Sequence, residues 1–209
     1  MTLQFQHLFK TISFVSLTFF SCLLWAEIEI DQEQAIHVPV NELHTSLLSI
    51  MKDADTRSFQ ERYDIMEKVV VKHFNSPLIA KVILSRHWKT LNEQSRTDFI
   101  DLFNRLTIST YVDRFDSFSG ETFNNLSIEQ MKENRFMIKT EFTRTDDEPV
   151  SFNYIVQNDG AEWKIISVIA NGINDLSLKR TDYSAIIKES GFNALISRLK
   201  DKIRNLRPK

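Results

Sequence analysis

Apolar and polar side chains alternate most regularly between residues 136 and 169. Three segments of this stretch, 136–142, 150–156 and 163–169, are rich in β-branched and aromatic residues. Because successive side chains of a strand point to opposite faces, the alternation predicts half-buried strands. Residues 158–160, Asn-Asp-Gly, tolerate the positive φ angles of a tight hairpin turn. The sequence therefore predicts an antiparallel meander with one apolar face. The inward positions of segments 136–142 and 150–156 are Phe136, Ile138, Thr140, Phe142, Val150, Phe152, Tyr154 and Val156.

Before this meander, apolar residues recur at the spacing of amphipathic helices. The first predicted helix covers residues 40–51 and follows an extended lead-in at residues 27–39. The second begins at Ser58, which opens a capping-box pattern, and the third begins at Ser76 as its N-cap. The fourth, over residues 93–115, is the longest, and its apolar stripe is broad enough to contact a sheet and another helix together.

The remaining segments complete the predicted architecture. Residues 118–128 form an irregular first strand, and two helices separated by Gly191 follow the meander. Helices, then strands, then helices are typical of a single α+β domain. We expect this domain to span residues 27–209, with a four-stranded antiparallel meander covered on one face by the N-terminal and C-terminal helices.

The N-terminus has a different pattern. Lys10 is its only formally charged side chain before Glu27, and residues 12–25 are almost wholly apolar or small. This pattern predicts a secretory signal peptide over residues 1–26, because the apolar run is shorter than the roughly 20 residues of a membrane-spanning helix. An uncleaved N-terminal anchor is the alternative, and Cys22, the only cysteine, loosely resembles a lipoprotein acylation site.

Charge and motifs argue against several classes of function. The formal net charge is −2, so there is no reason to expect nucleic acid as a partner. The histidines after the signal segment form no HxH or HxxxH pair, which argues against a metal site. The sequence also contains no GxSxG motif and no glycine-rich phosphate loop, so a nucleophilic hydrolase has no starting point.

Two further interpretations concern what fills the space against the apolar face. A pocket enzyme of the ketosteroid-isomerase type would need a carboxylate on an inward strand position. The predicted inward positions carry none, and Glu141 points the other way. A scaffold with a solid core would use the same residue types as a hollow pocket, and the chain holds 16 Phe, four Tyr and three Trp. The pattern alone does not separate a filled core from a cavity.

An ordered series of short motifs runs from about residue 41 to residue 203. Each motif is weak alone, and their order and spacing together are specific. The series comprises Trp88-Lys-Thr-Leu91 with Gln94, Phe99 and Phe103, then Thr110-Tyr111, Val150-Ser-Phe-Asn-Tyr-Ile-Val156, Trp163-Lys-Ile-Ile-Ser-Val168, Asn171-Gly-Ile173, Arg180 with Tyr183, and Gly191-Phe192 with Leu195, Ile196 and Leu199.

This series resembles the MlaC family of periplasmic phospholipid-binding proteins, also called the toluene-tolerance family. Residues 171–184 are similar to the hopanoid-associated HpnM branch of that family. The resemblance implies a lipid carrier of the Gram-negative periplasm, with no catalysis and no cofactor. It also implies an inner-membrane lipid ABC transporter and an outer-membrane lipoprotein complex as partners.

The same resemblance implies an apolar pocket between the sheet and its helices that holds the acyl chains of phospholipid or another polar lipid. Arg180, close after the last strand, is a candidate contact for the head-group phosphate. The candidate acyl-chain contacts are Val70, Phe74, Phe99, Phe103, Leu106, Tyr111, Phe136, Ile138, Phe142, Phe152, Tyr154 and Ile165.

Overall fold

The computed structural model describes residues 15–144 and 147–206, with side chains from residue 32 onward. Residues 1–14, part of the predicted signal peptide, lie outside the described residues. The chain divides into two compact units, Met1–His37 and Val38–Lys209. Among the described residues, no helix has both the length and the apolarity that a membrane span needs.

Helix α1 (Val15–Lys52) is longer than the pattern predicts. It includes the predicted helix over residues 40–51 and continues through residues 27–39, so the expected extended lead-in is wrong. The physical reason is local composition: Pro39 removes one backbone donor, but residues 32–35, Gln-Glu-Gln-Ala, are good helix formers. Of the predicted apolar stripe of this segment, Val40, Leu43, Leu47 and Met51 are buried and Leu48 is partly buried.

Three further α-helices precede the sheet: α2 (Phe59–His73), α3 (Ser76–Leu84) and α4 (Glu93–Arg114), with the 3-10 helix η1 (Ser85–Thr90) before α4. The capping box at the start of α2 is confirmed, because Ser58 and Glu61 exchange side-chain and backbone hydrogen bonds. The cap of α3 is Asn75 instead of Ser76: the Asn75 side-chain oxygen accepts a hydrogen bond of 3.1 Å from the Leu78 amide. Asparagine caps a helix as well as serine does, and Asn75 lies one position further out.

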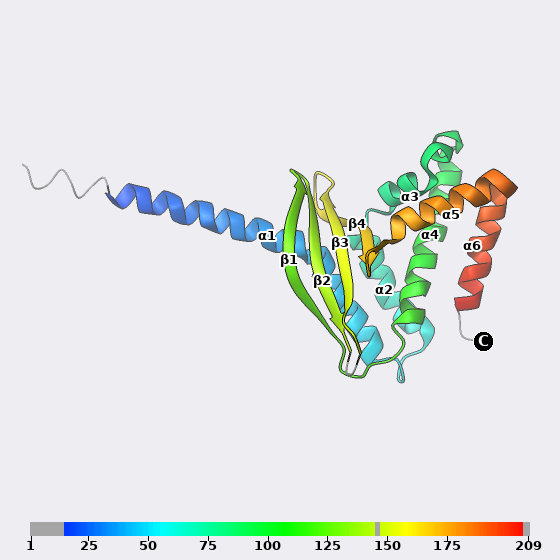
Figure 1. The fold of residues 1–209 in the computed structure, drawn as a ribbon, viewed down its shortest axis with the longest axis horizontal. Helices are drawn as coiled ribbons and strands as arrows, with labels where there is room; N and C mark the ends of the chain where they lie inside the picture. The colour runs from blue at the N-terminus through cyan, green and yellow to red at the C-terminus, as the bar shows by residue number, and fades with distance from the viewer. Residues whose placement is uncertain (1–14, 145–146, 207–209) are drawn as a thin grey trace, which may run out of the picture. The chain divides into compact units, whose positions relative to one another are not determined.

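The sheet has five strands in the order β1-β2-β3-β4-β5, all paired antiparallel (Figure 1). They are β1 (Thr122–Lys132), β2 (Arg135–Thr143), β3 (Val150–Asn158), β4 (Trp163–Ala170) and β5 (Ile173–Asn174). The meander is confirmed, and the predicted number of four strands is one too few. Strand β5 follows a turn in which Asn171 and Gly172 have φ angles of 48° and 78°. Its two residues are too few to produce a visible alternation in the sequence.

The register of β2 against β3 confirms the predicted inward face. Phe136 pairs with Val156, Ile138 with Tyr154, Thr140 with Phe152, and Phe142 with Val150, so these side chains share one face. Ile138, Thr140, Phe142, Tyr154 and Val156 are buried. The irregularity predicted for the first strand is also confirmed, by register shifts between Asn125 and Ser127 and between Gln130 and Lys132.

Two helices follow the sheet, α5 (Asp175–Ser190) and α6 (Phe192–Leu206). Helix α5 contacts α3 and β4, and α6 contacts α4 and α5. Figure 1 shows α3, α4, α5 and α6 gathered on the β4 side of the sheet. Helix α4 contacts α2, α3 and α6, and Phe115, directly after its end, contacts Phe142 on β2.

Candidate functional site

Six aromatic rings form a continuous cluster at the inward face of the sheet, which we call the sheet cluster. Its members are Phe74 at the end of α2, Tyr111 and Phe115 at the end of α4, Phe123 on β1, Phe142 on β2 and Phe152 on β3.

The rings of the sheet cluster are close together. Ring centroids lie 4.7 Å apart for Phe123 and Phe142, 5.8 Å for Phe115 and Phe142, and 6.1 Å for Phe142 and Phe152. On the helical side, Tyr111 lies 6.1 Å from Phe115 and 6.3 Å from Phe74. Tilted and edge-to-face contacts at these distances are typical of packed aromatic side chains. The cluster therefore forms an apolar wall built from five elements far apart in the sequence.

A polar pair lies beside this wall. Nε2 of His44 on α1 and the hydroxyl of Tyr154 on β3 are joined by a hydrogen bond of 3.1 Å. The His44 ring stacks on Phe123 with a centroid distance of 4.0 Å and an interplanar angle of 7°. Burial lowers the pKa of His44 to about 4 and raises the pKa of Tyr154 well above its usual value. Both side chains are therefore uncharged at neutral pH.

A second aromatic cluster lies among the helices, and we call it the helical cluster. Phe99 on α4 is fully buried, and its ring centroid lies 6.2 Å from Phe103, 6.4 Å from Tyr183 on α5 and 6.2 Å from Phe192 on α6. All four rings come from helices. The sequence analysis assigned Phe99 and Phe103 to the same pocket as the sheet residues. In the structure the Phe99 ring contacts rings of α5 and α6, and Phe103 stacks on Phe99.

The other predicted site residues divide in the same way. Phe74, Tyr111, Phe142 and Phe152 belong to the sheet cluster, and Tyr154 belongs to the polar pair beside it. Phe136 lies at the opposite end of β2 from Phe142, and its ring centroid lies 5.4 Å from that of Trp163. The remaining four are buried on α2, α4, β2 and β4: Val70, Leu106, Ile138 and Ile165.

Three residues at the sheet cluster were absent from the predicted site: His44, Phe115 and Phe123. A signal for His44 exists, because it lies four residues after Val40 and four before Leu48 on the apolar stripe of its helix. Phe115 and Phe123 flank the irregular connection from α4 to β1, where periodicity is weak. Their place follows from the fold and has no local signature.

Arg180 lies on α5, and its guanidinium donates a hydrogen bond of 3.1 Å to the Ser85 hydroxyl. Ser85 begins η1 and has a φ angle of 53°. The contact holds α5 against the connection between α3 and α4. A role of Arg180 at a lipid head group stays a prediction.

The inward positions of β2 and β3 are all uncharged, which bears on acid–base chemistry. Glu141 points to the outer face together with Lys139, which forms an ion pair with Glu129 on β1. The buried carboxylate of Glu121, before β1, accepts a hydrogen bond of 2.5 Å from the Ser119 amide and lies 3.7 Å from Nε of Arg144. Glu121 therefore has structural partners at the start of the sheet.

Comparison with known proteins gives a family and a fold. The family model described as MlaC protein matches residues 41–201. A solved structure with a similar fold is the phospholipid-binding protein from Ralstonia solanacearum in complex with a phospholipid, with a TM-score of 0.73 and 16% sequence identity over 82% of this chain and 98% of that chain. At this identity the structural likeness shows the fold. No curated protein matches the chain closely enough to serve as a relative.

Proposed function

We propose that this chain, which belongs to the MlaC family, is a non-catalytic periplasmic carrier that binds the acyl chains of a phospholipid at the sheet cluster. The observation that carries the proposal is the cluster itself: a wall of aromatic rings from α2, α4 and three strands, with no charged side chain on the inward positions of β2 and β3. The structurally similar Ralstonia protein, solved with a phospholipid, supports the choice of ligand.

The physics of acyl-chain binding fits an apolar wall. Each methylene removed from water contributes about 0.8 kcal/mol, so a long acyl chain gains most where it is buried along its whole length. Phe123, Phe152 and Tyr111 are only partly buried, unlike Phe142, which is 3% exposed. These three rings are therefore the part of the wall that can rotate away at least cost when a chain enters. The polar head group can then stay in water at the mouth.

The polar pair gives the site one fixed hydrogen-bonding point. His44 and Tyr154 satisfy one another in the present arrangement, so neither leaves an unpaired buried group. The pair orients Tyr154 under the wall, and its Phe123 stack ties α1 to the edge strand β1. We propose that this pair sets the separation of helix and sheet at the site.

The wider assignments rest on the family resemblance. They are secretion of the chain by its N-terminal segment, transport of lipid between outer and inner membranes, and partnership with a lipid ABC transporter and a lipoprotein complex. The likeness of residues 171–184 to the HpnM branch adds a hopanoid to the candidate lipids.

The proposal is tested by the mass of the lipid that the protein carries. The chain is purified without lipid-stripping detergent, and native and denaturing mass spectrometry are compared. We expect the folded protein to retain a lipid whose fragment ions identify two acyl chains, or a hopanoid skeleton. A well-folded protein that is repeatedly recovered without lipid, and that takes none from phospholipid vesicles, contradicts the proposal.

A further inference from the structure

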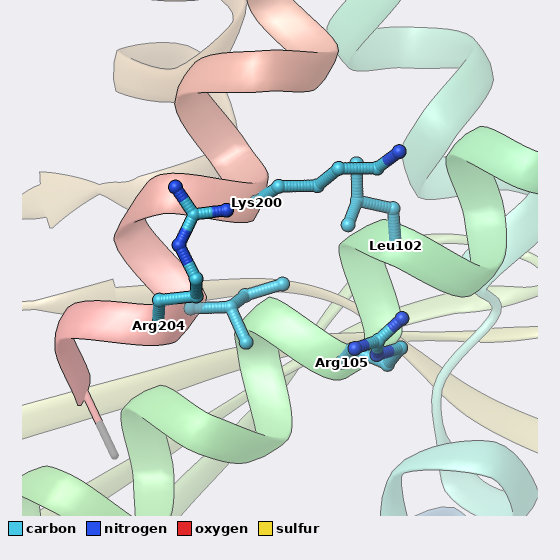
Figure 2. Close-up of a pocket in the computed structure, with 5 residues that line it drawn as sticks. Leu102, Arg105, Lys200 and Arg204 are labelled. Atoms are coloured by element: carbon cyan, nitrogen blue, oxygen red, sulfur yellow. The ribbon is translucent and has the colours of Figure 1, made fainter. Parts of the chain in front are cut away.

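A pocket of about 240 Å³ lies between α4 and α6, and it is lined by Leu102, Arg105, Lys200, Ile203 and Arg204. Figure 2 shows Leu102 and Arg105 leaving α4, and Lys200 and Arg204 leaving α6, around the same opening. Leu102 and Ile203 are 5% and 3% exposed, so they form an apolar floor beneath three cationic side chains. None of these residues belongs to the sheet cluster.

The charge of this pocket is unbalanced. Arg105 and Lys200 have no ion-pair partner among the described residues, and Arg204 pairs only with Asp201 on its own helix. Helix α6 carries four basic side chains, Arg198, Lys200, Lys202 and Arg204, against the single acidic Asp201. The whole chain has a formal net charge of −2, whereas the side chains around this pocket carry positive charge. Three positive charges around one opening, of which only Arg204 has an acidic partner in the part of the chain that the structure describes, favour the binding of an anion.

The shape of the pocket narrows the choice of anion. Pockets that enclose a drug-sized molecule measure about 300–1,000 Å³, so the present volume suits a small polar group. A free inorganic anion has no apolar part that could contact an apolar floor. The phosphate of a lipid head group is attached to glycerol, whose carbon atoms can contact that floor. Cationic side chains near a membrane surface are attracted to anionic lipids, and arginine binds phosphate oxygens in pairs.

We infer that the α4–α6 pocket binds the phosphate head group of an anionic lipid in a bilayer and so docks the protein on a membrane surface. Arg105 and Arg204 contact the phosphate oxygens from opposite helices, Lys200 adds a third positive charge, and Leu102 and Ile203 face the glycerol carbons. This site is separate from the proposed acyl-chain site and does not depend on it. It provides a surface from which the carrier can exchange its lipid.

The test compares binding of the full chain to vesicles of phosphatidylcholine alone and of phosphatidylcholine mixed with phosphatidylglycerol, by flotation at low salt. The variant Arg105→Gln/Lys200→Gln/Arg204→Gln removes the three pocket charges. The control Lys68→Gln/Lys81→Gln/Lys132→Gln removes three exposed charges elsewhere, which form no ion pair within the described part of the chain, and so changes the net charge equally. The N-terminal segment is the same in all proteins, so only the gain due to the anionic lipid is compared.

We expect the anionic lipid to strengthen vesicle binding of the unaltered chain and of the control, and added salt to weaken it. We expect the affinity of the pocket variant for anionic vesicles to fall about fivefold for each charge removed, or on the order of 100-fold in all. Equal losses in the pocket variant and the control overturn the inference, because general charge then explains the binding. Calorimetry with inorganic phosphate tests whether the pocket binds free phosphate instead of a lipid head group. The inference is also overturned if the unaltered chain binds phosphate, the pocket variant does not, and the anionic lipid does not strengthen vesicle binding.

The two proposals fail separately in these experiments. Loss of the vesicle effect, with a lipid still carried by the purified protein, rejects the docking site alone. A purified protein that carries no lipid, takes none from phospholipid vesicles and still binds anionic vesicles through the pocket rejects the carrier function alone. Circular dichroism of each variant establishes that it is folded before binding is compared.

Discussion

The sheet cluster and the helical cluster are built from the same residue types, and helix α4 contributes to both. Its first half gives Phe99 and Phe103 to the helical cluster, where every ring comes from a helix. Tyr111 in its last turn, and Phe115 directly after the helix, belong to the sheet cluster, where half of the rings come from strands. Aromatic content therefore does not by itself mark a ligand site. The sheet cluster differs in that half of its rings come from strands and that the His44–Tyr154 pair lies beside it.

The largest effect should come from the helical cluster. Phe99→Ala removes a fully buried ring between three helices, so we expect the free energy of unfolding to fall by about 3–5 kcal/mol. Denaturant unfolding measures this change, and the lipid retained per folded molecule should stay the same. Phe99→Leu is the matched control and should cost less. Lost lipid with little change in stability would place Phe99 in the ligand site and remove the distinction between the clusters.

The next effect is the pH dependence that His44 gives the sheet cluster. Its pKa is about 4 in the folded protein and near 6.5 when unfolded, because burial disfavours the charged ring. The unfolded state therefore binds a proton first, and stability falls as pH decreases from about 6.5 to about 4. A shift of this size corresponds to about 3 kcal/mol.

Unfolding titrations at several pH values measure this His44 contribution as the difference between the unaltered chain and His44→Gln. Burial also lowers the pKa of His73, which acts in the same direction, so the variant should keep part of the slope. Equal slopes for both proteins would mean that His44 is accessible to water and that the polar pair does not close the site.

Phe152→Ala should change stability less than Phe99→Ala does and should reduce lipid retention more. Phe152 is only partly buried, and it pairs with Thr140 of β2 and Ala170 of β4. We therefore expect the free energy of unfolding to fall by about 2 kcal/mol, less than for a fully buried ring. We also expect the fraction of molecules that retain lipid to fall clearly, as measured by native mass spectrometry. A loss of stability with unchanged lipid would make the sheet cluster an ordinary core.

The smallest effect is expected on the outer face of the sheet. Lys139→Ala removes an ion pair with Glu129 in which both side chains are exposed, so the change in stability should be below about 1 kcal/mol. Lipid retention should not change. This variant lies on β2 between Ile138 and Thr140, which makes it a control for the strand that carries the inward residues. Reduced lipid retention in Lys139→Ala would show that the outer face also contributes.

The sequence predicts the inward face well because one residue of register decides burial for a whole strand. Ile138 and Tyr154 pair directly, as the alternation requires, and both are buried. The capping box at Ser58 is equally local and equally predictable. By contrast, a strand of two residues, Ile173–Asn174, has no periodicity, and its pairing depends on the turn before it.

The division of the candidate site could not be predicted for a different reason. A helical stripe indicates which residues of α4 are buried and does not indicate against which element. Phe99 and Tyr111 therefore look alike in the sequence, although their rings contact different layers. His44 was predictable as a buried residue from its stripe, but its bond to Tyr154 spans 110 positions and needs the tertiary fold.

Binding of acyl chains at the sheet cluster can be tested by photo-cross-linking with a phospholipid that carries a diazirine near the end of one acyl chain. The protein is loaded with this lipid, irradiated and digested, and the labelled residues are identified by mass spectrometry. We expect label on the sheet cluster, in the peptides that contain Phe115, Phe142 and Phe152. Label confined to the peptides of Phe99 and Phe192, from a protein that has taken up the lipid, would contradict it.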